Sequence, residues 1–185
     1  VEADGKTTSI AAGLLVGADG VWSTVRAQLA ARDSAFARSR FSGRLAWRTT
    51  VAVDSPAGQA FAEIGVAGCV TTFLHPGFHL VAYPVSKGRT VNLAAFTRGE
   101  RIAEGWSGHA DPAILSNAMR GTAPMLAKLI ALAGSWTAFP MHTVRQQRWA
   151  VPQGIALIGD AAHAMTPFAA QRCCRTVCIG NAVHD

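Results

Sequence analysis

Residues 154–167 read GIALIGDAAHAMTP and are the most informative segment of this 185-residue chain. The apolar run 155–158 ends abruptly at Gly159-Asp160, a pattern typical of a buried parallel strand followed by a tight turn. Ligands bind at the carboxyl ends of such strands in open α/β sheets, which predicts a ligand-binding edge at Asp160. Gly159 would leave room for close approach of a ligand, and the small side chains of Ala161-Ala162 would leave room at the surface that follows the turn.

The carboxylate of Asp160 could accept hydrogen bonds from the hydroxyl groups of a planar cofactor with a polyol stem. A helix beginning after Pro167 would direct its N–H groups at such a ligand and favour negative charge. An ordinary strand-to-helix turn capped by Asp160 is the simpler alternative, and this stretch alone leaves both open. His163 also has two possible roles. It could be a catalytic group, or a polar core residue hydrogen-bonded to the backbone.

The rest of the pattern predicts an α/β fold, with mixed α and β segments. A β-type run over 7–16 breaks at residues 17–20, and a helix is expected over 23–31. Strands are expected over 44–53, 69–74, 78–85, 90–97, 137–144 and 155–158, and helices over 111–119 and 123–133. Two α/β segments would thus flank a β-rich insert, with predicted domains 1–40, 41–145 and 146–171 and an aberrant tail, 172–185.

Composition narrows the class of protein. Half of the residues are hydrophobic, which excludes global disorder, and no run approaches the roughly 18 apolar residues of a membrane helix. The net charge is +6, but the arginines between Arg26 and Arg48 are spread over several turns, with no aromatic interleaving of the RNA-binding type. We therefore expect a solvated or anion-steering face and no nucleic-acid binding.

Cysteine usage indicates a reducing, cytoplasmic location. Cys69 stands alone, whereas Cys173, Cys174 and Cys178 crowd the end of the chain. Their spacing matches neither a zinc site nor a disulfide framework. His75 and His79 have the spacing of a helical metal pair, but Pro76-Gly77 prevents that helix. No metal is expected.

Two motifs in the right order resemble class A, single-component flavoprotein monooxygenases. Residues 154–171 are similar to the family's second flavin-binding signature, and residues 14–26, LLVGADGVWSTVR, resemble its earlier Asp-Gly signature. Residues 45–48 and 79–85 resemble the salicylate-hydroxylase-like branch. The resemblance implies an incomplete Rossmann-like FAD domain interrupted by a substrate domain, NAD(P)H as transient reductant, O₂, and hydroxylation of an aromatic substrate.

The resemblance also implies which residues bind FAD. Asp160 would contact the ribityl or pyrophosphate portion, Pro167 and the following backbone would lie beside the isoalloxazine, and the Asp19-Gly20 turn with Ser23 and Arg26 would support flavin and NAD(P)H. The full expected set is Gly17, Asp19, Gly20, Arg26, Gly159, Asp160, Ala161, Ala162, Pro167, Ala169 and Ala170.

Strand alternation suggests the catalytic face. In 78–85, His79, Val81 and Tyr83 point to the same side, and an imidazole and a phenol there would suit a ring bearing a hydroxyl or carboxylate. The imidazole of His79 could accept a phenolic proton. The alternative is that His79 and Tyr83 are ordinary residues on a water-exposed sheet surface.

The sequence also departs from the family. Nothing before Gly17 has the form G-x-G-x-x-G, and there is no N-terminal Met, so the numbering is expected to open inside a longer chain. After Gln171 the character changes in a way typical of a reading-frame shift. The 185 residues alone are therefore predicted to bind FAD weakly or not at all, which equilibrium dialysis would check. Alternatives are a non-catalytic remnant and a related flavin epoxidase or halogenase; a homodimer is possible.

Overall fold

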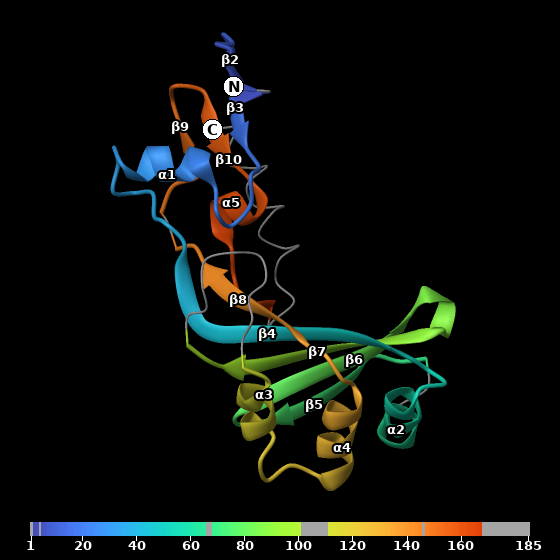
Figure 1. Cartoon of the computed structure of the whole chain (residues 1–185). Coiled ribbons are helices and arrows are strands. Elements are labelled where there is room, and N and C mark those ends of the chain that lie inside the picture. Colours follow the sequence, from blue (N-terminus) through green and yellow to red (C-terminus); the bar gives the residue numbers. More distant parts are fainter. Residues whose placement is uncertain (1, 4, 66–67, 101–110, 146, 168–185) are drawn as a thin grey trace. The chain divides into compact units, whose positions relative to one another are not determined.

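The computed structural model describes the chain apart from residues 1, 4, 66–67, 101–110, 146 and 168–185. The chain divides into two compact units (Figure 1). The flanking unit comprises residues 1–40 together with those from His142 onward, and the central unit comprises Phe41–Met141. The flanking unit is therefore discontinuous in sequence.

A small sheet organises the flanking unit. Its strand order is β3-β10-β9, with β3 parallel and β9 antiparallel to β10. One helix follows each of the two parallel strands, and a separate two-stranded hairpin lies near the N-terminus. The elements are β1 (Glu2–Ala3), β2 (Lys6–Thr7), β3 (Leu15–Gly17), α1 (Thr24–Ala30), β9 (Ala150–Val151), β10 (Ile155–Leu157) and α5 (Gly159–His163).

The structure differs from one sequence prediction in this unit. The strand expected over 7–16 is confined to β3 and the end of β2, because residues 8–14 are exposed and outside any strand. The helix expected after Pro167 lies outside the described residues, and helix α5 begins directly after β10 at Gly159. Helix α1 agrees with the prediction, and its N-cap is Ser23, whose Oγ accepts a hydrogen bond from the Arg26 amide at 2.9 Å.

A five-stranded sheet with helices forms the central unit. The strand order is β5-β6-β7-β4-β8. Among the described residues, no helix has the length and apolar character needed to cross a membrane. The elements are β4 (Arg40–Ala52), α2 (Pro56–Ile64), β5 (Thr71–His75), β6 (Phe78–Val85), η1 (Ser86–Gly88), β7 (Thr90–Arg98), α3 (Pro112–Ala118), α4 (Pro124–Leu132) and β8 (Thr137–Thr143).

The three helices α2, α3 and α4 lie on the same side of this sheet (Figure 1). Alternate strand residues point at them and form the main core, in which Leu45, Leu80 and Leu93 are fully buried. Trp47 is also fully buried and donates its indole N–H to Thr97 Oγ1 at 2.9 Å, which satisfies both polar groups. The residues between these core positions form the opposite face of the sheet, which we call the open face.

Helix α2 was not predicted from the sequence. Ser55 Oγ caps it by accepting from the Gly58 amide at 3.1 Å, and Pro56 occupies its first turn. Gly58 lies inside the helix, where glycine usually signals a break. A Cβ on Gly58 would lie 2.2 Å from the carbonyl oxygen of Ala52, so the close approach of helix and strand requires glycine there.

Candidate functional site

The Asp19 and Asp160 turns lie at the same edge of one sheet. Strands β3 and β10 pair in parallel with Gly17 opposite Leu157, and the Ile158 amide donates to the Gly17 carbonyl oxygen at 3.0 Å. The turn after β3 contains Asp19, and the turn after β10 leads into Asp160. Parallel neighbouring strands end at the same side of a sheet, so segments about 140 residues apart meet where α/β folds bind ligands.

Asp19 is fixed by hydrogen bonds from the start of α1. Its Oδ2 accepts from the Thr24 amide at 2.8 Å, the Thr24 hydroxyl at 3.0 Å and the Val25 amide at 3.3 Å. Partial burial acts to raise the pKa of Asp19, but hydrogen bonds from Ser23 and these amides outweigh it, and the pKa lies below its ordinary value. Asp19 therefore remains ionised near neutral pH.

Arg26 links the two turns. Its side chain is only 2 % exposed, Nη1 donates to the Ala161 carbonyl oxygen at 2.7 Å, and Nη2 donates to the carbonyl oxygen of Val21. Burial lowers the pKa of Arg26 and the nearby Asp19 charge opposes that shift, but a guanidinium stays protonated in proteins. Arg26 was expected to support the cofactor, and the structure shows that it joins α1 to α5 through the backbone.

The predicted glycines of this edge serve two different purposes. Gly20 and Gly159 have φ angles of +78° and +56°, and a Cβ on either would meet nothing within 4 Å. Their backbones are therefore accessible to a ligand. Gly17 is tightly packed instead, since a Cβ there would lie 2.7 Å from Leu157 Cδ2 and 3.1 Å from Val25 Cβ.

Replacing Gly17 with alanine is expected to destabilise the flanking unit by about 1–3 kcal/mol, because the added methyl group overpacks the contact between β3, β10 and α1. Gly13→Ala is the matched control, since a Cβ there meets nothing within 4 Å. Urea unfolding of both variants measures the difference. Equal midpoints for the two would contradict this account of Gly17.

Of the other predicted residues, Asp160 is half-buried in the first turn of α5, and Ala161 and Ala162 are fully buried, so neither alanine exposes surface to a ligand. Pro167 is exposed. Ala169 and Ala170, together with Phe168, Gln171 and the three C-terminal cysteines, lie outside the described residues.

His163 is a predicted polar side chain with unusual surroundings. It is 6 % exposed, and neither ring nitrogen has a hydrogen-bond partner among the described residues. A buried imidazole without partners is costly, which marks this turn as a place where a polar partner is needed.

The chemistry of this edge fits the flavin cofactor. Asp160 offers a carboxylate at the end of a parallel strand, and Gly20 and Gly159 offer backbone that a ligand can approach. A carboxylate is a strong acceptor for ribityl or ribose hydroxyl groups. This edge therefore offers groups of the kind that FAD requires, and the binding roles of these residues stay predictions.

The open face of the central sheet carries the predicted catalytic residues. In β6, Phe78, Leu80 and Ala82 are buried against the helices, so His79, Val81 and Tyr83 lie on the open face. The register of β6 with β7 places His79 opposite Phe96 and Tyr83 opposite Asn92. Their shared orientation thus agrees with the alternation of the sequence, whereas their catalytic role stays a prediction.

His79 stacks on Phe96, with ring centroids 4.7 Å apart and an interplanar angle of 26°. Burial and the positive charge of Arg44 lower the pKa of His79 below its ordinary value. The imidazole is therefore neutral, and able to accept a proton, at a lower pH than a free histidine. Arg44 and Phe96 were not among the predicted site residues. The alternation of residues 44–53 does, however, place Arg44 on the face of the strand away from the buried Leu45.

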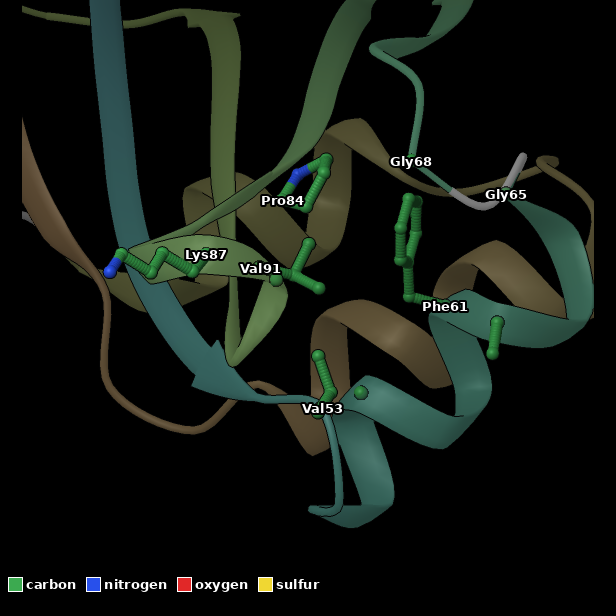
Figure 2. Close-up of a pocket in the computed structure, with 10 residues that line it drawn as sticks. Val53, Phe61, Gly65, Gly68, Pro84, Lys87 and Val91 are labelled. Atoms are coloured by element: carbon green, nitrogen blue, oxygen red, sulfur yellow. The ribbon is translucent and has the colours of Figure 1, made fainter.

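A separate apolar pocket of about 510 Å³ lies between α2, the end of β4 and the β6–β7 connection. Figure 2 shows Phe61 and Val91 on its walls, with the Lys87 ammonium directed away from them. Val91 belongs to the helix-covered side of the sheet, so this pocket is distinct from the open face. Its lining offers no side chain suited to proton transfer apart from Lys87. Among the described residues, no group of three or more His, Cys, Asp or Glu side chains could hold a metal ion.

Comparison with known proteins defines the class. The sequence matches the protein family described as "FAD binding domain" over residues 1–172. The chain belongs to this FAD-binding family, which confirms its resemblance to the class A flavoprotein monooxygenases.

Two curated relatives illustrate the likeness. The chain is 33 % identical over 173 residues to 3-amino-4-hydroxybenzoate 2-monooxygenase of Streptomyces platensis, covering 91 % of this chain and 40 % of that protein. It is 31 % identical over 167 residues to salicylate hydroxylase of Pseudomonas putida, covering 83 % and 38 %. The chain thus spans about two fifths of the length of these relatives.

Solved structures share the fold. A salicylate hydroxylase substrate complex superposes with a TM-score of 0.75 over 99 % of this chain and 49 % of that one, at 24 % identity. HpxO of Klebsiella pneumoniae, complexed with FAD and uric acid, gives a TM-score of 0.63 at 30 % identity, over 87 % and 39 %. The mixed α/β, Rossmann-like fold predicted from the sequence is confirmed.

Proposed function

We propose that the protein containing this chain is an FAD-dependent monooxygenase that hydroxylates a small aromatic substrate. In the balanced reaction, NAD(P)H, a proton, O₂ and the aromatic compound give NAD(P)⁺, water and the hydroxylated ring. The observation that carries the proposal is the meeting of the Asp19 and Asp160 turns at the end of parallel strands β3 and β10. The names of the relatives, among them salicylate and 3-hydroxybenzoate hydroxylases, support an aromatic substrate.

In this proposal the flanking unit holds the flavin. Asp160 accepts hydrogen bonds from the polyol part of the cofactor, and the backbone at Gly20 and Gly159 lies against it. Asp19 and Arg26 keep α1 and α5 in place. The bound flavin would supply the activation of O₂ and the transfer of one oxygen atom.

The central unit orients the substrate. The ring would lie on the open face beside the His79–Phe96 stack, where Nε2 or Nδ1 of His79 can accept the phenolic proton. Removing that proton makes the ring more electron-rich and so easier to oxygenate. Tyr83, one alternation along β6, would hold the ring by hydrogen bonding. A homodimer and a cytoplasmic location remain predictions from the sequence.

The test is the full-length protein, purified and mixed with NADH or NADPH and a set of phenols and hydroxybenzoates. A flavin absorption spectrum, together with NAD(P)H oxidation stimulated by one of these aromatic compounds and formation of its hydroxylated product, is the expected result. Flavin without hydroxylated product would favour a related epoxidase or halogenase. Purified protein that neither contains nor takes up flavin would favour the non-catalytic remnant.

A further inference from the structure

The apolar pocket beside α2 lies outside the proposed active site. Its volume of about 510 Å³ is within the range of roughly 300–1,000 Å³ that small-molecule sites have. Pro84 and Val91 line it from the helix-covered side of the sheet, the side opposite to His79. Phe61 of α2 forms the facing wall (Figure 2). Water finds few hydrogen-bond partners among such side chains, so an apolar molecule is favoured there.

Close contacts at two glycines fix the walls of this pocket. A Cβ on Gly65 would lie 2.4 Å from Cε2 of Phe61, and a Cβ on Gly58 would lie 2.2 Å from the Ala52 carbonyl oxygen. The Gly65 amide also donates to the Phe61 carbonyl oxygen at 2.7 Å. Helix α2 is therefore packed closely on the end of β4 with the Phe61 ring held in place, and the pocket has the pre-formed walls typical of ligand sites.

The β6–β7 connection places a lysine at the mouth of the pocket in an unusual backbone conformation. Val85 pairs with Thr90, so residues 86–89 form the connection. Ser86 and Lys87 have φ angles of +53° and +58°, and neither is a glycine. Residues with side chains rarely adopt this left-handed region, and those that do are frequent at ligand-binding sites, where the surrounding structure holds them.

Lys87 is the charged side chain of the lining. It is exposed, and no acidic side chain of the described residues forms an ion pair with it. Its ammonium is directed away from the apolar walls (Figure 2). Asp54 and Glu63 neighbour lining residues in the sequence, but neither belongs to the lining. A molecule whose apolar part lies between the walls would therefore find a partner for one negative group at the mouth.

We infer that this pocket binds a small apolar molecule that carries one anionic group, a sulfonate or a carboxylate. The apolar part lies between Phe61, Pro84 and Val91, and the anionic group contacts the Lys87 ammonium. The site is separate from the open face on which the proposed hydroxylation takes place. Binding to it is measured without any turnover, so the inference stands or falls independently of the proposed function.

The experiment compares 2-naphthalenesulfonate with 2-naphthalenesulfonamide, which differ in charge and little in shape, by equilibrium dialysis against the full-length protein with FAD. Ala62→Trp, at an exposed wall position of α2, is expected to raise both Kd values at least 10-fold because the indole occupies the pocket. Lys87→Gln should raise the Kd of the sulfonate about 3- to 5-fold and leave the sulfonamide unchanged, because one solvent-exposed ion pair is lost. Added salt should likewise weaken only the sulfonate.

Ala127→Trp and Lys128→Gln are the matched controls, since both positions are exposed on α4 and outside the lining. Neither should change either Kd. Urea unfolding checks that Ala62→Trp is folded. Val53→Trp, at a second exposed wall position, replaces it if it is not.

No binding of either compound to the wild type would overturn the inference. Wild-type affinity in Ala62→Trp, with binding lost instead in Val81→Trp on the open face, would overturn it as well. Lys87→Gln that weakens both compounds equally, or neither, would show that the pocket does not recognise the anionic group, and this result also contradicts the inference.

Discussion

Replacing His79 with asparagine is expected to lower kcat for hydroxylation by roughly 10²- to 10⁴-fold, the usual contribution of a positioned general base. The imidazole is neutral because burial and the charge of Arg44 lower its pKa, and it stacks on Phe96 at 4.7 Å. Asparagine keeps the polarity of the side chain but cannot accept the phenolic proton. Steady-state kinetics with the preferred substrate measure the loss.

The pH dependence follows from the direction of this pKa shift. A histidine with a lowered pKa loses its proton at lower pH, so kcat/KM of the wild type should stay high at pH 6.5, near the ordinary histidine pKa, and fall only below it. Arg44→Gln removes a positive charge and should move the fall of kcat/KM at acidic pH, the acidic limb, to higher pH. The limb should disappear in His79→Asn.

His75→Asn is the control, because His75 lies at the end of β5 and its Nδ1 accepts from the Gly77 amide within its own turn. It should leave the kcat of the enzyme unchanged. An unaltered kcat in His79→Asn, or an equal loss in His75→Asn, would rule out His79 as the base.

Replacing Arg26 with alanine is expected to lower the free energy of unfolding by about 3–5 kcal/mol. Two charge-assisted hydrogen bonds, each worth about 1.5–3 kcal/mol, are lost, and the buried carbonyl oxygen of Ala161 and the partly buried one of Val21 are left without this donor. Because Arg26 holds the Asp19 turn to the Asp160 turn, the affinity for FAD should fall as well.

Urea unfolding and FAD titration of the full-length protein test this prediction. Arg32→Ala, at an exposed position just after α1, should change stability by no more than about 0.5 kcal/mol. Arg26→Lys keeps the charge but not the forked set of donors. Its stability and FAD affinity should lie between those of Arg26→Ala and Arg32→Ala. Arg26→Ala with wild-type stability and FAD affinity would show that the link between the turns is dispensable.

Much of the fold was predictable because its elements carry clear local signals. The 78–85 strand coincides with β6, and Gly159-Asp160 marks the end of β10 as expected. Helix α2 was missed because Gly58 suggests a break. The reason for glycine there is the close packing of the helix on the end of β4, where a Cβ would lie 2.2 Å from the Ala52 carbonyl oxygen, and the sequence pattern does not show this packing. The strand expected over 7–16 was too long because apolar character alone does not supply a pairing partner.

The candidate site was predictable in part for a similar reason. Turn motifs identified Asp19 and Asp160, and alternation placed His79 and Tyr83 together. The bond from Arg26 to the Ala161 carbonyl spans 135 residues, and no local pattern indicates it. Arg44 and Arg48 looked like members of a solvated basic stretch, because only the register of β4 with β7 shows which cations share the face of His79.

The central claim is that the turns at Asp19 and Asp160 bind one flavin. A crystal structure of the full-length protein grown with FAD tests it most directly. We predict that the ribityl or pyrophosphate oxygens lie within hydrogen-bond distance of Asp160 and that the cofactor contacts the backbone of Gly20 or Gly159. FAD bound elsewhere, with Asp160 facing solvent and both glycines free of it, would contradict the account.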